Sequence, residues 1–323
     1  MPHLLVAGKL HPSGLDLLRQ APVTFDYVEE IDEPSYQAHL SRADALVIRT
    51  QPLSAASIAK APGLKIVSRH GVGYDAVDVP ALNARGIPLC IVGDVNSSGV
   101  AEHAMMLILA ATHRLIAADR ATRGGDWAWR NGLQTHEVAG KRLLVVGFGR
   151  IGQKLAGLAR AFGMEVHAYD PFIPADRWPQ GATRATDLAA AVAGADAVSL
   201  HLPRADGAIL GAAELAAMKP TAVVVNTARG GLVDEVALAD ALRAGRLGGA
   251  GIEVFDAEPP GKDHPLFGLD QAVLTPHNAA LTVECAERMA LASVQNVLDF
   301  FAGRLDPALV VNRAADGLKE SAK

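Results

Sequence analysis

The chain has 323 residues, half of them apolar and one fifth charged, a composition typical of a globular protein rather than a disordered one. A chain of this length exceeds the size at which one hydrophobic core usually stops growing, so we expect two domains. The 30 basic and 35 acidic residues give a net charge of −5, and this mildly acidic balance argues against a nucleic-acid partner.

Short apolar segments rich in Val, Ile and Leu alternate along the chain with alanine-rich segments of helical pattern. Strands are expected at residues 4–8, 45–49, 65–69, 142–148, 165–170, 197–202, 222–227, 250–255 and 273–275. Helices are expected at residues 14–20, 98–114, 151–162, 214–218, 235–244 and 281–301. Strands that are apolar throughout, each followed by a helix, indicate parallel sheets covered on both faces.

The alternation of strands and helices is interrupted once, by the long helix expected at residues 98–114 and the irregular stretch 124–140 that follows it. We therefore place a domain boundary near Ser97. One domain is expected to contain residues 1–97 together with 282–323, because the last long helix returns to it. The other domain is expected to contain residues 98–281.

The cysteines and the N-terminus bear on the cellular compartment. Cys90 and Cys285 lie far apart in sequence, so neither a disulfide framework nor a metal-binding cluster is expected. Residues 1–10 lack the pattern of a secretory signal, and the apolar stretch 104–112 is too short to span a bilayer. We expect a cytoplasmic protein with no metal site and no membrane partner.

A glycine-rich motif follows the strand expected at residues 142–148. It reads Gly147-x-Gly149-x-x-Gly152, it precedes an amphipathic helix, and the next strand ends in Asp170. The interval of 170 − 149 = 21 residues is close to the offset of about 20 residues in dinucleotide-binding βαβ units. The motif would supply the tight turn, the approach to a pyrophosphate and the close packing of helix on strand.

The charge at Asp170 predicts which dinucleotide is bound. Its carboxylate can accept hydrogen bonds from the ribose hydroxyls and would repel a 2′-phosphate, so the sequence predicts NAD rather than NADP.

Three polar residues follow later strands: Arg229, Glu258 and His277. Oxidation of a secondary alcohol by hydride loss needs a base for the hydroxyl proton, and histidine is suited to that task. A carboxylate bound to the other ring nitrogen stabilises the protonated imidazole. A planar guanidinium holds the carboxylate of a 2-hydroxy acid. We therefore expect Arg229 to anchor the substrate, His277 to transfer the proton and Glu258 to tune the histidine.

The chain resembles the D-isomer-specific 2-hydroxyacid dehydrogenase family in several blocks that occur in the family's order. These blocks are SRHGVGYDAVD (68–78), NSSGVAEHAMMLILA (96–110), VVGFGRIG, VVNTARGGLVDE, GIEVFDAEP and LTPHNAA. The resemblance implies two Rossmann-like, doubly wound parallel-sheet domains with the active site in the cleft between them. Residues 98–281 would be the NAD-binding domain, and residues 1–97 with 282–323 the substrate domain. It also implies a homodimer formed through the NAD-binding domain.

The resemblance further implies individual contacts. Substrate contacts are expected from Gly71, Val72, Gly73 and Arg229. Cofactor contacts are expected from Gly147, Gly149, Arg150, Ile151, Gly152, Asp170, Thr227, Ala228, Arg229, Glu253, His277, Asn278, Ala279 and Ala280. Two positions depart from the family's pattern: Glu253 stands where the family usually has Asp, near the nicotinamide carboxamide, and residues 203–206 read Pro-Arg-Ala-Asp where Pro-Leu-Thr is frequent.

Two other functions are compatible with this fold. A formate dehydrogenase abstracts no hydroxyl proton, and its pattern has Gln in place of the triad Glu, so Glu258 argues against it. An NAD-sensing corepressor or scaffold would bind the dinucleotide without turnover. Within the enzyme interpretation the 2-hydroxy acid stays open, including whether Arg69 and His70 meet a second anionic group on it.

Overall fold

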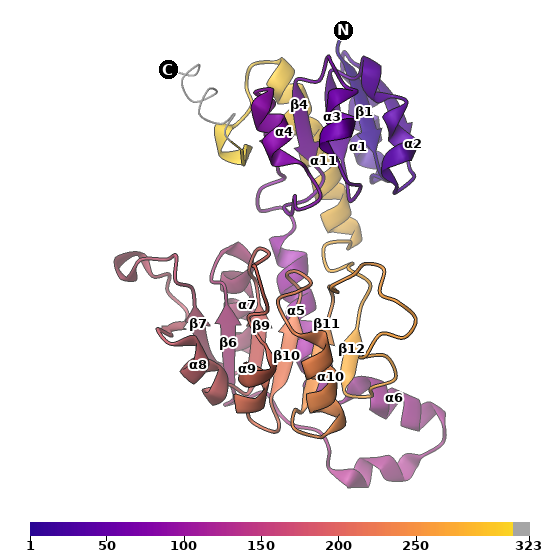
Figure 1. Cartoon of the computed structure of the whole chain (residues 1–323). Helices are drawn as coiled ribbons and strands as arrows, with labels where there is room; N and C mark the ends of the chain where they lie inside the picture. The colour runs from indigo at the N-terminus through magenta and orange to yellow at the C-terminus, as the bar shows by residue number, and fades with distance from the viewer. Residues whose placement is uncertain (313–323) are drawn as a thin grey trace. The chain divides into compact units, whose positions relative to one another are not determined.

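The structure, a computed structural model, describes residues 1–312; residues 313–323, the end of the predicted substrate domain, lie outside the described residues. The chain forms two compact units (Figure 1). Met1–Asn96 and the segment that begins at Leu281 form unit 1, and Ser97–Ala280 form unit 2. Each unit is described by itself below.

Unit 1 is built on five parallel strands in the order β2-β1-β3-β4-β5. Its strands are β1 (His3–Ala7), β2 (Thr24–Val28), β3 (Ala45–Ile48), β4 (Ile66–Arg69) and β5 (Leu89–Cys90). Its helices are α1 (Pro12–Gln20), α2 (Glu33–Gln37), α3 (Ala55–Ala59), α4 (Val79–Ala84) and α11 (Val283–Phe301), with 3-10 turns η1 (Leu40–Arg42) and η4 (Pro307–Leu309).

Unit 2 contains seven parallel strands in the order β12-β11-β10-β9-β6-β7-β8. They are β6 (Arg142–Val146), β7 (Glu165–Tyr169), β8 (Thr183–Arg184), β9 (Ala197–Leu200), β10 (Val223–Asn226), β11 (Gly249–Ile252) and β12 (Ala272–Leu274). The helices are α5 (Ser97–Thr112), α6 (Leu115–Arg123), α7 (Arg150–Ala161), α8 (Leu188–Gly194), α9 (Ala212–Ala217) and α10 (Glu235–Arg243), with 3-10 turns η2 (Trp127–Gly132) and η3 (Ala175–Arg177).

The side chains of each strand alternate between two hydrophobic cores, because successive residues of a strand point to opposite faces of its sheet. In β6, Leu144 and Val146 pack with α8, α9 and α10, whereas Leu143 and Val145 pack with α5 and α7. In unit 1 the strand faces are covered by α2, α3 and α4 on one side and by α1 and α11 on the other. Both units therefore confirm the predicted parallel α/β class.

Each sheet has one point at which the chain order reverses. In unit 1 it lies between β1 and β3, and in unit 2 it lies between β6 and β9. In open parallel sheets, ligands bind outside the carboxyl ends of the strands at such a point. The fold itself thus indicates one candidate ligand position in each unit.

The predicted C-terminal end of the helix at residues 98–114 is wrong. The helix α5 ends at Thr112 and a separate helix, α6, begins at Leu115, because Arg114 adopts a left-handed conformation with φ of 51°. The strands β2, β5 and β8 were not predicted. β5 and β8 have two residues each, too few to produce a periodic pattern, and β2 (TFDYV) mixes polar with apolar residues.

Among residues 1–312, no single helix is both long and apolar enough to cross a membrane; α5 and α6 meet the length and composition criteria only as a pair bent by 59°.

Candidate active site

The glycine-rich turn of unit 2 follows β6 at the point where its strand order reverses. Gly147 has a φ of +91°, and a Cβ atom there would lie 2.3 Å from the carbonyl oxygen of His201. A Cβ atom on Gly152 would lie 2.3 Å from the carbonyl oxygen of Gly147. Both distances are far below a van der Waals contact, so neither position accepts a side chain without rearrangement of the turn.

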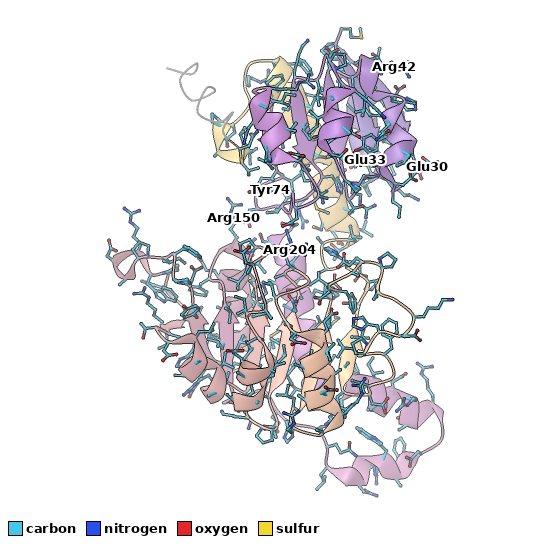
Figure 2. The ribbon with its side chains drawn as sticks, viewed as in Figure 1. Glu30, Glu33, Arg42, Tyr74, Arg150 and Arg204 are labelled. Atoms are coloured by element: carbon cyan, nitrogen blue, oxygen red, sulfur yellow. The ribbon has the colours of Figure 1, made fainter. Side chains whose placement is uncertain are left out.

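Gly149 differs from its two neighbours in the motif, since no atom lies within 4 Å of a Cβ built on it. It is the N-cap residue of α7 and provides no capping side chain. The first amide groups of α7 therefore face open space at the positive end of the helix dipole, an arrangement suited to a phosphate. Arg150 begins the helix, and its exposed side chain extends from the ribbon there (Figure 2).

Asp170 directly follows β7, the strand adjacent to β6. One carboxylate oxygen accepts a hydrogen bond from the Phe148 amide at 2.9 Å, and the other accepts from the Phe172 amide at 3.0 Å. Each carboxylate oxygen has two lone-pair sites, so both keep acceptor capacity for ribose hydroxyls. Asp170 thus ties the glycine-rich turn to the end of β7.

The three proposed catalytic side chains follow three adjacent parallel strands: Arg229 follows β10, Glu258 follows β11 and His277 follows β12. All three therefore lie beyond the same edge of the unit 2 sheet. Gly71, Val72 and Gly73 belong to unit 1, where they follow β4. Gly71 has a φ of +149°, and the exposed Tyr74 follows this loop (Figure 2).

Glu258 and His277 form a hydrogen-bonded pair, with 2.6 Å between a carboxylate oxygen and the ring Nδ1. The second oxygen of Glu258 accepts from the Phe255 amide at 3.1 Å. Burial raises the pKa of Glu258, but the hydrogen bonds from His277 and Phe255 outweigh it and bring the pKa below its ordinary value. Glu258 is therefore a carboxylate at neutral pH, and it fixes the orientation of the imidazole.

The turn that carries Arg229 is held by Asn226, a buried residue that sequence reasoning missed. Its side-chain amide donates to the Arg229 carbonyl at 2.8 Å, and its amide oxygen accepts from the Ala228 backbone at 3.0 Å. The Arg229 guanidinium donates to the Ala228 carbonyl at 2.6 Å. Within the described part of the chain, the buried hydroxyl of Thr227 has no hydrogen-bond partner, so it is free to bind a ligand. An asparagine at a strand end, directly before the turn, was the available signal.

Glu253 supports the segment that carries His277. It is fully buried, and its carboxylate accepts hydrogen bonds from Thr275 and from the Ala279 amide. His103 of α5 lies 3.2 Å from the same carboxylate. Burial raises the pKa of Glu253, but these hydrogen bonds bring it below its ordinary value.

His277 itself adopts a φ of 51°, and its amide donates to the Glu253 carbonyl at 3.1 Å. Glu253 thus anchors the backbone on both sides of Asn278. The contact that sequence reasoning assigned to Glu253, near the nicotinamide carboxamide, stays a prediction.

A second buried carboxylate–histidine pair holds the segment that carries Glu258. Glu235 lies 2.9 Å from Nε2 of His264, and its other oxygen accepts from the Asp256 amide at 3.1 Å. The His264 ring packs edge-on against Phe255, with ring centroids 5.2 Å apart. Sequence reasoning missed this pair, because residues 235 and 264 meet only when the segment after β11 folds back over α10.

Residues 105–279 match the family model described as D-isomer specific 2-hydroxyacid dehydrogenase, NAD binding domain. D-3-phosphoglycerate dehydrogenase of Mycobacterium tuberculosis is 41% identical over 313 residues, which cover 96% of this chain and 59% of that protein. Glyoxylate reductase of Korarchaeum cryptofilum is 35% identical, with 96% of both chains covered. The NADPH-dependent glyoxylate/hydroxypyruvate reductase structure from Sinorhizobium meliloti has a TM-score of 0.82 and 30% identity, with 94% of this chain and 95% of that chain covered. The chain thus spans about three fifths of the length of the phosphoglycerate dehydrogenases it matches.

Proposed function

The chain belongs to the D-isomer-specific 2-hydroxyacid dehydrogenase family and carries the family's NAD-binding domain, and from this premise we propose its reaction. It moves a hydride between NAD(H) and C2 of a small D-2-hydroxy acid or 2-keto acid. The observation that carries the proposal is the hydrogen-bonded pair of Glu258 and His277, at the sheet edge that also carries the glycine-rich turn. This pair supplies the acid–base function that the reaction requires.

The residues of unit 2 fit the dinucleotide. The turn from Gly147 to Gly152 leaves room at Gly149 for a pyrophosphate, and the first amides of α7, at Arg150 and Ile151, can donate to it. Asp170 can accept from the ribose hydroxyls. The remaining contacts toward the nicotinamide half are assigned to residues 227–229, Glu253 and residues 277–280. The bound nicotinamide supplies or accepts the hydride.

His277 transfers the proton that accompanies the hydride. In the direction of reduction it donates a proton to the keto oxygen, and in the direction of oxidation it removes the hydroxyl proton. Glu258, ionised at neutral pH and bound to Nδ1, stabilises the protonated imidazole and leaves Nε2 for the substrate oxygen. A formate dehydrogenase mechanism transfers no such proton, so this pair favours the hydroxy-acid reaction.

Arg229 binds the substrate carboxylate. A guanidinium offers two parallel N–H donors that match a carboxylate, and it keeps its charge at every relevant pH. The amides of Gly71, Val72 and Gly73 are assigned to the same substrate carboxylate. Asn226, which holds the turn at Arg229, is assigned a positioning role.

The decisive experiment is a screen of NADH oxidation with short 2-keto acids, including glyoxylate, hydroxypyruvate, its 3-phosphate ester and oxaloacetate, with formate and NAD as a separate arm. We expect turnover with at least one keto acid and none with formate. A protein that only senses NAD would bind NADH without oxidising it in the presence of any keto acid, and that result would overturn the proposal.

We also propose that the enzyme is a cytoplasmic homodimer. Cys90 and Cys285 are buried free thiols, in keeping with a reducing compartment. In α6 and η2 of unit 2, Leu115 is 54% exposed and Trp127 is 66% exposed, and Leu133 directly after η2 is 85% exposed. Exposed apolar side chains gathered in one segment are typical of a subunit interface.

Light scattering coupled to size-exclusion chromatography tests the dimer. We expect twice the monomer mass for the wild type and a shift toward monomer for the combined variant Trp127→Ser, Leu133→Ser. Phe172→Ser, which replaces a still more exposed aromatic residue outside this segment, is the control. A monomeric wild type at micromolar concentration would contradict the assignment.

A further inference from the structure

His103 of α5 is a histidine to which the proposed function assigns no task. The helix α5 packs closely on β11, since a Cβ atom on Gly251 would lie 2.7 Å from Cβ of Leu107. His103 lies one turn before Leu107 on the same face of the helix. Glu253 lies two residues after Gly251, on the same face of the sheet. The packing of one helix on one strand therefore brings His103 and Glu253 together, with 3.2 Å between the ring Nε2 and a carboxylate oxygen.

The hydrogen bonds around Glu253 indicate which ring nitrogen of His103 carries a proton. Nε2 lies 3.0 Å from the hydroxyl oxygen of Thr275 as well. The Thr275 hydroxyl donates its single proton to Glu253, and an ionised carboxylate can only accept. Nε2 must therefore carry a proton that it shares between Thr275 and Glu253. His103 is thus a donor to this carboxylate whether its ring is neutral or protonated.

Glu253 depends on its donors because it is fully buried. Burial raises its pKa, but hydrogen bonds from His103, Thr275 and the Ala279 amide bring the pKa below its ordinary value. A buried charge is tolerated only where hydrogen-bond donors replace the lost water. Thr275 and Ala279 belong to the segment after β12, whereas His103 belongs to α5. His103 is therefore the donor that holds this carboxylate from outside the segment.

The segment after β12 includes a backbone conformation that needs support. His277 has a φ of 51°, in the left-handed region that residues other than glycine rarely adopt. Such a conformation persists only where the surrounding structure fixes it. The His277 amide donates to the Glu253 carbonyl at 3.1 Å, and the Ala279 amide donates to the Glu253 carboxylate. Glu253 therefore fixes the turn of His277 with both its backbone and its side chain.

We propose that His103 is a positioning residue for proton transfer: through Glu253 it holds the turn of His277 in its observed conformation. This inference rests on the proposed function, which gives His277 its acid–base role. It extends that function to α5, a helix that carries none of the assigned side chains. A group that transfers a proton must be held close to its productive position. A looser turn should therefore slow turnover without changing the proton affinity of the imidazole.

Two variants of His103 test the role in kinetics with the keto acid that the screen identifies. His103→Leu removes the donor, and His103→Gln keeps an N–H donor. We expect kcat to fall about tenfold to hundredfold in His103→Leu, the usual effect of losing a hydrogen bond to a charged group. KM for the keto acid should change little, because Arg229 is untouched. The alkaline limb of the pH profile should stay in place, because Glu258 still stabilises the protonated imidazole. His103→Gln should recover most of kcat.

His113→Leu is the matched control, since His113 directly follows the other end of α5 and is exposed. It should leave kcat and the pH profile as in the wild type. An unchanged kcat in His103→Leu would refute the positioning role. So would a His103→Gln variant as slow as His103→Leu, because the donor would then be irrelevant. An alkaline limb displaced to lower pH in His103→Leu would also refute it, because His103 would then act on the proton affinity of His277.

A measurement without turnover separates this inference from the proposed function. NMR spectra of the protein with ¹⁵N-labelled histidine rings report on each ring, and the signals absent from His277→Ala belong to His277. We expect one narrow set of His277 signals in the wild type, His103→Gln and His113→Leu, and a broadened or doubled set in His103→Leu. If no keto acid is reduced but these signals depend on the His103 donor, the proposed function fails and the positioning role stands. If the His277 signals are the same in all four proteins, the positioning role fails whatever the turnover.

Discussion

Asp170 has two hydrogen-bonding tasks at the end of β7: it accepts from the amides of Phe148 and Phe172, and it is assigned to the ribose. Its negative charge should repel a 2′-phosphate. We expect kcat/KM to be at least tenfold higher with NADH than with NADPH, and Asp170→Asn to narrow the difference. Steady-state kinetics with both cofactors measure this. Equal or better efficiency of the wild type with NADPH would refute the ribose assignment.

At Arg229 the contribution of side-chain geometry to substrate binding can be separated from the contribution of its positive charge. Arg229→Lys keeps the positive charge but loses the planar pair of donors that holds a carboxylate. We expect KM for the keto acid to rise at least tenfold, with a smaller change in KM for NADH. Arg243→Lys, an exposed substitution in α10, is the control and should change neither. An unchanged KM in Arg229→Lys would mean that another group anchors the substrate.

The three residues could be proposed as catalytic from the sequence because each follows a predicted strand, and adjacent parallel strands end at one edge of a sheet. Their supports could not be found in this way. Asn226 acts through a turn, and His103 and Glu253 meet only because α5 packs against the sheet next to β11. The contact between His103 and Glu253 depends on which elements pack together, and no local pattern in the sequence encodes that, whereas Asn226 had a local signal as an asparagine at a strand end directly before the turn.

At the scale of elements, two glycines of α7 test whether the glycine-rich turn requires a residue without a side chain. A Cβ atom at Gly152 would meet the Gly147 carbonyl, whereas one at Gly157 has no atom within 4 Å. Gly152→Ala should destabilise the protein by about 1–3 kcal/mol, as overpacking does, and should weaken NADH binding. Gly157→Ala should stabilise it by about 0.5–1 kcal/mol. Denaturant unfolding and NADH titration measure both effects; equal behaviour of the two variants would contradict the packing argument.

The elements that the sequence predicted correctly are the strands buried on both faces and the long helices. The strand expected at 142–148 and the helix expected at 151–162 correspond to β6 and α7. The short helices α2, α3, α4 and α8 were missed because five to seven residues span at most two turns. Predicted strands also ran past their observed ends, as for β11, because the apolar Val254 and Phe255 follow Glu253 in the loop after Ile252.

At the scale of the whole molecule, the predicted family and the predicted pair of parallel-sheet domains are confirmed. The assigned groups are divided between the two units. The dinucleotide turn, Arg229, Glu258 and His277 belong to unit 2, and Gly71, Val72 and Gly73 belong to unit 1. The central claim is that His277, tuned by Glu258, donates the proton in keto-acid reduction, and it can be tested on the complete chain.

The carboxylate of Glu258 and the protonated imidazole stabilise each other. Burial raises the pKa of Glu258, but the hydrogen bonds from His277 and from the Phe255 amide bring it below its ordinary value. For reduction His277 must arrive protonated, so the carboxylate should keep the enzyme active to higher pH. Glu258→Gln removes the negative charge of the side chain and keeps its shape. The alkaline limb of the pH profile of keto-acid reduction should therefore move to lower pH. Glu165→Gln, at an exposed glutamate of β7, is the control.

The most direct measurement is the pH dependence of kcat for NADH-dependent reduction in the wild type, Glu258→Gln and Glu165→Gln, with His277→Ala measured beside them. We predict that the alkaline limb moves to lower pH in Glu258→Gln only, and that His277→Ala loses about 10²- to 10⁴-fold in kcat. Uniform loss of activity in Glu258→Gln with an unmoved limb would make Glu258 a structural residue. A near-normal rate in His277→Ala would contradict the account outright, because the proton would then come from another group.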